Sequence, residues 1–161
     1  MTIPDDILKM DFTRAVKMED GRHLEGDGYL WTYGVGGCWA TMIYAQGSGK
    51  NHGILTHYSP PHFHVNRYKL RQLGREHPEM KSAQRKGAVI LLDDMYDLAD
   101  ELGYHATKVG VHELAIKDMF GEMEVKVIQY PLFYPDDGMR EVIVDLETGR
   151  WHSWFACGTL I

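Results

Sequence analysis

The chain has 161 residues, a length that suits one domain, and 44% of them are apolar, enough for a sizeable core. Its net charge of −6 at pH 7, with histidine neutral, argues against non-specific nucleic-acid binding, which requires a basic face. No apolar run approaches the roughly 20 residues of a membrane helix, and the start, MTIPDDILKMDF, lacks the regions of a secretory signal. We therefore expect a cytoplasmic protein with no nucleic-acid and no membrane partner.

Apolar periodicity and turn residues predict the elements of the first part of the chain. In chain order these are a helix over 3–10, a loop over 19–28, and strands over 29–33, 38–45 and 52–58. The segment QGSGK between the last two strands is typical of a hairpin loop.

The rest of the chain mixes helical and extended patterns without regular alternation. We expect a helix over 67–74 capped by Asn66, a short helix from Pro78, a strand over 87–92, a helix over 95–102, a strand over 123–130 and a hairpin over 140–156. The aromatic residues of WHSWFACG are expected to pack in the core rather than to stack on a ligand. These elements predict a single α+β domain over 1–161, with a β-sandwich-like core of mixed or antiparallel strands and flanking helices.

The stretch TYGVGGCWATMIYA places Cys38 directly behind a glycine-rich turn. Gly36 and Gly37 can adopt backbone angles that are closed to other residues, and such a turn can aim several N–H groups at one point, as an oxyanion site needs. The other cysteine is Cys157, and a reducing compartment disfavours a bridge between the two. The turn and the thiol alone fit a catalytic nucleophile or a small buried side chain, so both interpretations stay open.

The predicted hairpin returns the chain toward this cysteine. If Ala45 faces Asn51 across the loop, a slip of one residue places Cys38 beside His57. An imidazole next to a thiol lowers the pKa of the thiol and moves its proton, which is the arrangement of a cysteine nucleophile and its base.

Three segments resemble the chemoreceptor glutamine deamidases, the CheD family. TYGVGGCWATMIY is similar to the family's pattern of threonine, any residue, glycine, apolar, glycine, small and cysteine before an apolar strand. GILTH is similar to the segment that carries the family's histidine, and EVIVDLETGRW to its closing hairpin. The chain departs from the pattern at Gly37, where the family usually has serine, and its Cys-to-His spacing is slightly longer.

The resemblance implies a cysteine hydrolase with the fold of the catalytic domain of cytotoxic necrotizing factor toxins. Family members remove ammonia from glutamine side chains of receptors, and some hydrolyse the corresponding methyl esters. By this resemblance Cys38 would be the nucleophile, His57 the base and Thr32 the group that orients His57, with backbone N–H groups at Gly36 and Gly37 holding the oxyanion. The implied partner is a protein or small amide substrate, and no metal or cofactor is required.

Two other classes of function remain open. One is a non-catalytic binding or adaptor domain on the same scaffold, and the other is a histidine-bound metal protein. His62 and His64 in PPHFHV would point to the same side of an extended segment, as a metal site needs, and His52 lies close to His57 in sequence. Because no carboxylate partner is obvious nearby, we expect His62 and His64 to be polar loop residues.

Overall fold

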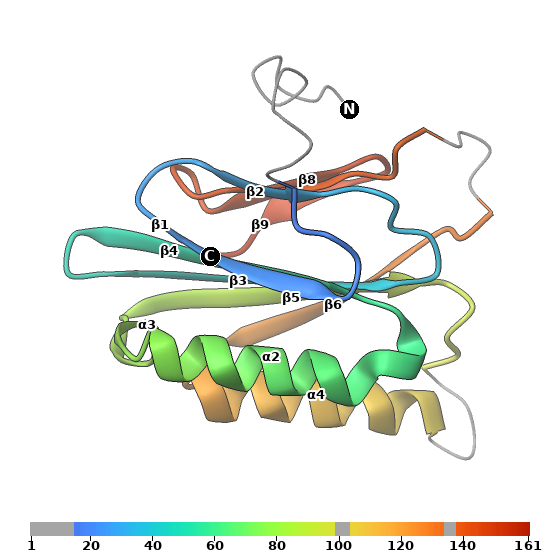
Figure 1. Cartoon of the computed structure of the whole chain (residues 1–161), viewed down its shortest axis with the longest axis horizontal. Coiled ribbons are helices and arrows are strands. Elements are labelled where there is room, and N and C mark those ends of the chain that lie inside the picture. Colours follow the sequence, from blue (N-terminus) through green and yellow to red (C-terminus); the bar gives the residue numbers. More distant parts are fainter. Residues whose placement is uncertain (1–14, 99–103, 134–137) are drawn as a thin grey trace.

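The computed structural model describes residues 15–98, 104–133 and 138–161, so the helix expected over 3–10 lies outside the described residues. In this part of the chain, two sheets stack face to face and helices cover the outer face of the larger one (Figure 1). The larger sheet has the order β1 (Asp20–Glu25), β4 (Lys50–Tyr58), β3 (Trp39–Gly47), β5 (Arg85–Asp93) and β6 (Glu124–Tyr130). The smaller sheet has the order β2 (Tyr29–Thr32), β7 (Val142–Asp145), β8 (Arg150–Ser153) and β9 (Cys157–Thr159).

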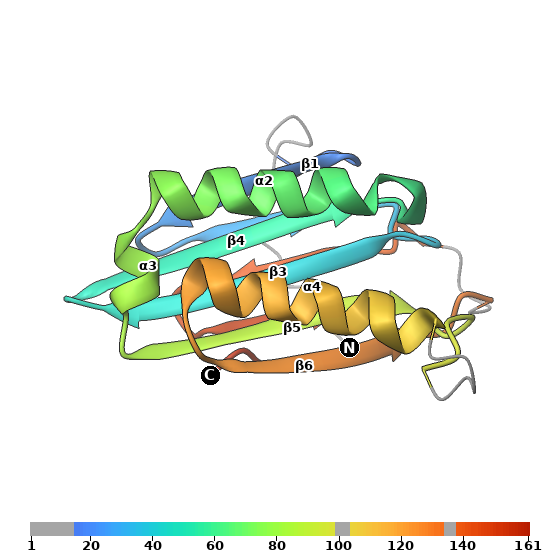
Figure 2. The same ribbon diagram turned by 90° about the horizontal axis from the view of Figure 1, so that it is seen from below.

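The helical elements of the described residues follow two of the strands of the larger sheet. They are η2 (Pro60–His62), α2 (Phe63–Glu76), α3 (Glu79–Ser82) and α4 (Tyr104–Phe120). Figure 2 shows α2 and α4 lying side by side over this sheet, with α3 at one end. All strand pairs are antiparallel except β5 and β6, which are parallel. The arrangement confirms the predicted α+β fold with a sandwich-like core of mixed strands and flanking helices.

The larger sheet is buried on both faces, which explains why its central strands are apolar at nearly every position. Along β3, Met42 and Tyr44 pack toward the smaller sheet, whereas Ile43 packs toward the helices. Trp151, from the segment expected to supply core aromatics, is buried between the sheets. None of the helices in the described residues is long and apolar enough to cross a membrane.

The predicted loop over 19–28 is wrong, because β1 occupies most of it. This charged segment pairs antiparallel with β4 along its whole length, with Asp20 opposite His57 and Glu25 opposite His52. As an edge strand it obtains its hydrogen bonds from β4 on one side, and charged side chains are common on such strands. Tertiary pairing therefore overrides a composition that is typical of turns.

The predicted helices were placed less well than the strands. The helix expected over 67–74 begins at Phe63 and continues past Gly74 to Glu76, so this glycine does not end it. In the region expected as a helix over 95–102, the described residues 95–98 form turns, and the rest lies outside the described residues. Helix α4 was not predicted.

The sequence of α4 lacks a clear apolar stripe. Val109, His112, Ile116 and Phe120 are buried at helical spacing. A polar residue interrupts that stripe at His112, and Leu114 on the other side is 68% exposed. Apolar periodicity alone therefore does not single out this helix.

Among the glycines of the described residues, Gly87 in β5 is the one at which an added Cβ would clash most severely. A Cβ built there would lie 1.4 Å from the backbone oxygen of Leu160, a core residue only 4% exposed. Gly87→Ala should therefore expel the C-terminal residues and lower the free energy of unfolding by about 2–3 kcal/mol, the contribution of one buried leucine. Urea unfolding measures this loss.

Gly110 in α4 provides the matched control for that substitution. A Cβ at this position meets nothing within 4 Å. Because alanine has the higher helix propensity, Gly110→Ala should leave stability unchanged or raise it by up to about 1 kcal/mol. Equal stability of Gly87→Ala and the unmodified chain would show that the C-terminal segment does not pack against β5.

Candidate active site

The hairpin of β3 and β4 has a tighter turn than expected. Its two turn residues, Ser48 and Gly49, both have positive φ (54° and 76°), as in a type I′ turn. This turn shifts the register by one residue from the sequence expectation, so that Ala45 faces His52 instead of Asn51.

Cys38 immediately precedes β3, and the register places it diagonal to His57. Ala40 is paired directly with His57, and Ala40 belongs to the core between the two sheets. Since side chains alternate along a strand, Cys38 falls on the same face as Ala40. Diagonal neighbours across an antiparallel pair are about 7–8 Å apart at Cα, a spacing that a long or aromatic side chain can bridge. The cysteine side chain is short, and its Sγ contacts Met18 Sδ.

Thr32 fixes the protonation of the His57 ring. The Thr32 hydroxyl, on β2 of the smaller sheet, donates its only proton to the Val16 carbonyl oxygen at 2.5 Å. It must therefore accept from His57 Nδ1, which lies 2.8 Å from Thr32 Oγ1. The ring consequently carries its proton on Nδ1, and Nε2 keeps a free lone pair.

Nε2 of His57 is buried and has no hydrogen-bond partner among the described residues. The whole residue is 1% exposed, and burial lowers its pKa to about 4, although the nearby Glu19 carboxylate opposes this effect. At neutral pH, His57 is therefore an uncharged base whose lone pair is unused.

The Cys38 thiol is covered rather than open. Its Sγ contacts Met18 Sδ at 3.8 Å, and the residue is 5% exposed while Met18 is 59% exposed. Burial raises the pKa of Cys38, and the Glu19 and Asp93 carboxylates raise it further. The thiol is thus protonated at neutral pH, and an exposed methionine side chain lies against it.

The turn before Cys38 is held by a side chain from the opposite end of the chain. Gly37 has φ +83°, a conformation that favours glycine. Its N–H donates to Tyr130 Oη at 2.8 Å, and Tyr130 Oη donates in turn to the Cys38 carbonyl oxygen at 2.8 Å. The Gly36 N–H donates to the Gly34 carbonyl oxygen at 2.9 Å. Both glycine N–H groups expected at an oxyanion site therefore already have acceptors, Gly36 within the turn and Gly37 on Tyr130.

The histidines of PPHFHV do not form a metal site. His62 ends η2, where its Nδ1 lies 2.8 Å from Glu19 Oε2 and 3.0 Å from Ser59 Oγ. His64 lies in the first turn of α2 and is exposed. Residues two apart on a helix point in nearly opposite directions, because the segment is helical rather than extended. His52 and His57 are likewise separated, since they lie on opposite faces of β4.

Thr32 and His57 therefore meet between the two sheets, and Cys38 lies just before β3, diagonal to His57 in the strand register. No protein-family model matches the chain, and no curated protein matches its sequence. The likeness to the glutamine deamidases consequently depends on the motif residues themselves, of which Thr32 and His57 are in direct contact.

Two residues at this region were missed by sequence reasoning. Tyr130 was expected only as the end of a strand, and Met18 lay outside every motif. No local pattern identifies either one, because each reaches Cys38 through tertiary packing. Met18 lies 20 residues and Tyr130 lies 92 residues from Cys38 in sequence.

Proposed function

We propose that this chain is a cysteine amidohydrolase that hydrolyses a side-chain amide, such as that of glutamine, or the corresponding methyl ester. The observation that carries the proposal is the hydrogen-bond chain from Val16 through Thr32 to His57. It holds the imidazole in the tautomer whose buried Nε2 accepts a proton, diagonal to the Cys38 thiol. A buried histidine with one nitrogen oriented and the other unpaired is the form that a general base requires.

The reaction begins with both groups uncharged. As Cys38 Sγ attacks the amide carbon, His57 Nε2 takes the thiol proton, so that no thiolate has to exist beforehand. The tetrahedral intermediate collapses with cleavage of the C–N bond, and the protonated His57 gives its proton to the leaving nitrogen, which departs as ammonia. The product of this half-reaction is a thioester on Cys38.

The second half-reaction reverses the roles of the same groups. His57 Nε2 removes a proton from water as the water oxygen attacks the thioester carbon. The C–S bond then breaks, and the protonated His57 returns its proton to Cys38 Sγ. The products are a carboxylic acid and the free Cys38 thiol. With a methyl ester as substrate the leaving group is methanol, and the remaining steps are the same.

Substrate binding requires access to the Cys38 thiol and a donor for the oxyanion. The Met18 side chain has to leave Sγ, which its exposed position allows. The N–H of Cys38 itself would hold the oxyanion, because the N–H of Gly36 is bonded within the turn and that of Gly37 to Tyr130.

The test is turnover of two probes by the full chain: a blocked glutaminyl peptide, followed by ammonia release, and the γ-methyl ester of the corresponding glutamyl peptide, followed by methanol release. Cys38→Ala should reduce turnover to the uncatalysed background. Cys157→Ser is the matched control, since Cys157 is an exposed free thiol, and it should leave turnover unchanged. Added hydroxylamine should divert the acyl group to a hydroxamate, because it competes with water for the thioester.

The covered thiol favours one alternative, a binding domain on the same scaffold in which Cys38 is only a packed side chain. The same assay separates the two. If the unmodified chain and Cys38→Ala release ammonia and methanol at the same rate, the hydrolase proposal is overturned and the binding domain is favoured.

A further inference from the structure

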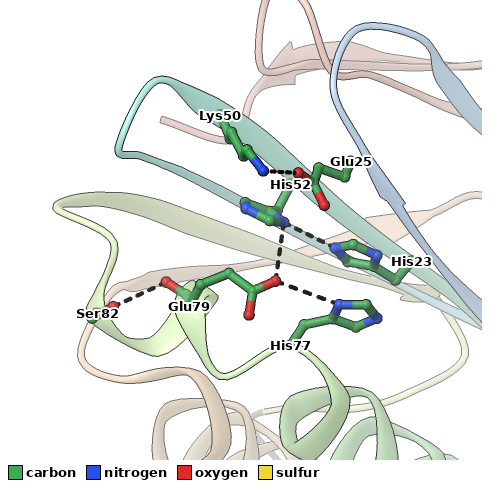
Figure 3. Close-up of polar contacts among 7 residues, drawn as sticks. All are labelled: His23, Glu25, Lys50, His52, His77, Glu79 and Ser82. Carbon is green, nitrogen blue, oxygen red and sulfur yellow. Dashed lines mark hydrogen bonds and ion pairs between the residues drawn. The ribbon is translucent and has the colours of Figure 1, made fainter.

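A second cluster of chemically competent side chains lies on the other face of β4 from His57. His52 is five residues before His57, and an odd separation along a strand places the two rings on opposite faces. On the helix-covered face, His52 meets His23 of β1 and Glu79 of α3 (Figure 3). We propose that His23, His52 and Glu79 bind Zn²⁺, with a fourth coordination position open to solvent. This proposal is independent of the hydrolase.

The ligand atoms already have nearly the spacing that zinc requires. His23 Nε2 and His52 Nδ1 are 3.0 Å apart, and His52 Nδ1 is 3.9 Å from Glu79 Oε1. All three ligand atoms lie within 4.8 Å of one another. Two ligands at 2.0–2.1 Å from a tetrahedral ion are about 3.3–3.4 Å apart. The His23–His52 and His52–Glu79 separations would therefore each have to change by well under 1 Å for these atoms to coordinate the ion.

The scaffold sets these positions through rigid elements. In the β1–β4 pair, His23 faces Ile54, two residues from His52, so the two rings are diagonal neighbours on one face of the sheet. Glu79 comes from the first turn of α3, which packs at the end of the sheet. Ligands supplied by strands and a helix are held more accurately than ligands on loops.

The residue types select the metal. Two imidazoles and one carboxylate are a ligand set found in zinc sites that keep a water at the fourth position. Mg²⁺ and Ca²⁺ prefer oxygen ligands throughout, so the two imidazoles disfavour them. Among the described residues, no cysteine joins this cluster, which disfavours the softest ions.

His77 supports the cluster from its outer side. Its ring stacks on that of His23, with centroids 3.4 Å apart and an angle of 15° between the planes. Its Nδ1 lies 3.5 Å from Glu79 Oε1. Contacts of this kind orient ligands around a metal and are part of its affinity.

A pocket lies in front of the proposed ion. It has a volume of about 590 Å³, and His52 and Glu79 contribute to its wall together with the ion pair between Lys50 and Glu25. His52 is 3% exposed, whereas Glu79 is an exposed side chain that can adjust to the ion. The fourth coordination position therefore faces a space that admits water or a small anion.

The experiment is a competition titration of the full chain with ZnCl₂ and a colorimetric zinc indicator. We expect one ion per chain. Glu79→Gln should weaken binding at least about 10-fold, and His52→Gln about 100-fold or more. Glu79→Gln changes an exposed side chain, so its result stands even if His52→Gln folds poorly. His64→Gln, an exposed histidine outside the cluster, is the control and should bind zinc as the unmodified chain does.

Cobalt substitution tests the open position. Co²⁺ at the site should give the intense visible bands of a four-coordinate ion, and added azide should change them by replacing water. Zinc affinity that is equal in Glu79→Gln, His52→Gln and the unmodified chain overturns the site. A cobalt spectrum that azide does not alter overturns the open fourth position and identifies a closed site completed by a protein ligand.

Discussion

Thr32→Val should lower turnover by about 100-fold or more and the free energy of unfolding by about 2–4 kcal/mol. Valine matches the shape of threonine but removes the hydroxyl that serves both Val16 and His57. The Val16 carbonyl oxygen and the His57 Nδ1–H would then be buried without a partner. Each such group costs about 1–3 kcal/mol, and the ring loses the contact that selects its tautomer.

Thr56→Val is the matched control for this substitution. Thr56 is as completely buried as Thr32, but its Oγ1 has no hydrogen-bond partner among the described residues. Removing that hydroxyl should therefore change stability little or raise it. Thr32→Ser retains the hydroxyl and should keep most of the turnover. Urea unfolding and ammonia release measure both effects, and equal stability of Thr32→Val and Thr56→Val would refute the hydrogen-bond chain.

The protein should lose stability as the pH is lowered from neutral, because two of its buried histidines are uncharged. Burial lowers the pKa of His57 to about 4 and that of His112 to about 3, with Arg67 lowering the latter further, against an ordinary value of 6.5. Below pH 6.5 the unfolded chain binds protons at both residues and the folded chain does not. Stability is therefore fully present above that pH and falls as the pH drops toward the folded-state values.

The expected loss at pH 5 is about 2 kcal/mol for each of the two histidines. Urea unfolding between pH 7.5 and pH 5 measures it above the range in which most carboxylates titrate. His23, which is partly exposed and whose pKa is also lowered to about 4, adds in the same direction. His57→Gln and His112→Gln should each remove about one proton from the pH dependence, whereas His64→Gln should remove none. A stability that stays constant from pH 7.5 to pH 5 would contradict the burial of neutral rings.

The parts of the site that could be predicted from sequence are those encoded by neighbouring residues. The hairpin with Cys38 before one strand and His57 in the next follows from two apolar runs and a glycine turn. Its register was wrong by one residue, because a five-residue segment was taken for the loop where a two-residue turn forms. The contact between Thr32 and His57 was expected only from the family resemblance, and the structure contains it.

The parts that could not be predicted depend on pairing between distant segments. The composition of β1 is that of a turn, and only β4 beside it makes it a strand. The same pairing brings His23 to His52, so the proposed zinc site has no sequence motif. Its third ligand, Glu79, comes from a short helix that was expected, but nothing local directs it toward the sheet.

Tyr130 also determines when the turn before Cys38 can form during synthesis. The Gly37–Cys38 turn depends on a hydroxyl that is translated 92 residues after Cys38. Among the described residues, β2, which carries Thr32, pairs with β7. A ribosome-bound chain that ends before β6 therefore has the thiol and the imidazole but not the scaffold that positions them. Such a late, long-range closure slows folding. It also means that the arrangement of Thr32, Cys38 and His57 forms late, in a chain that has nearly completed its fold.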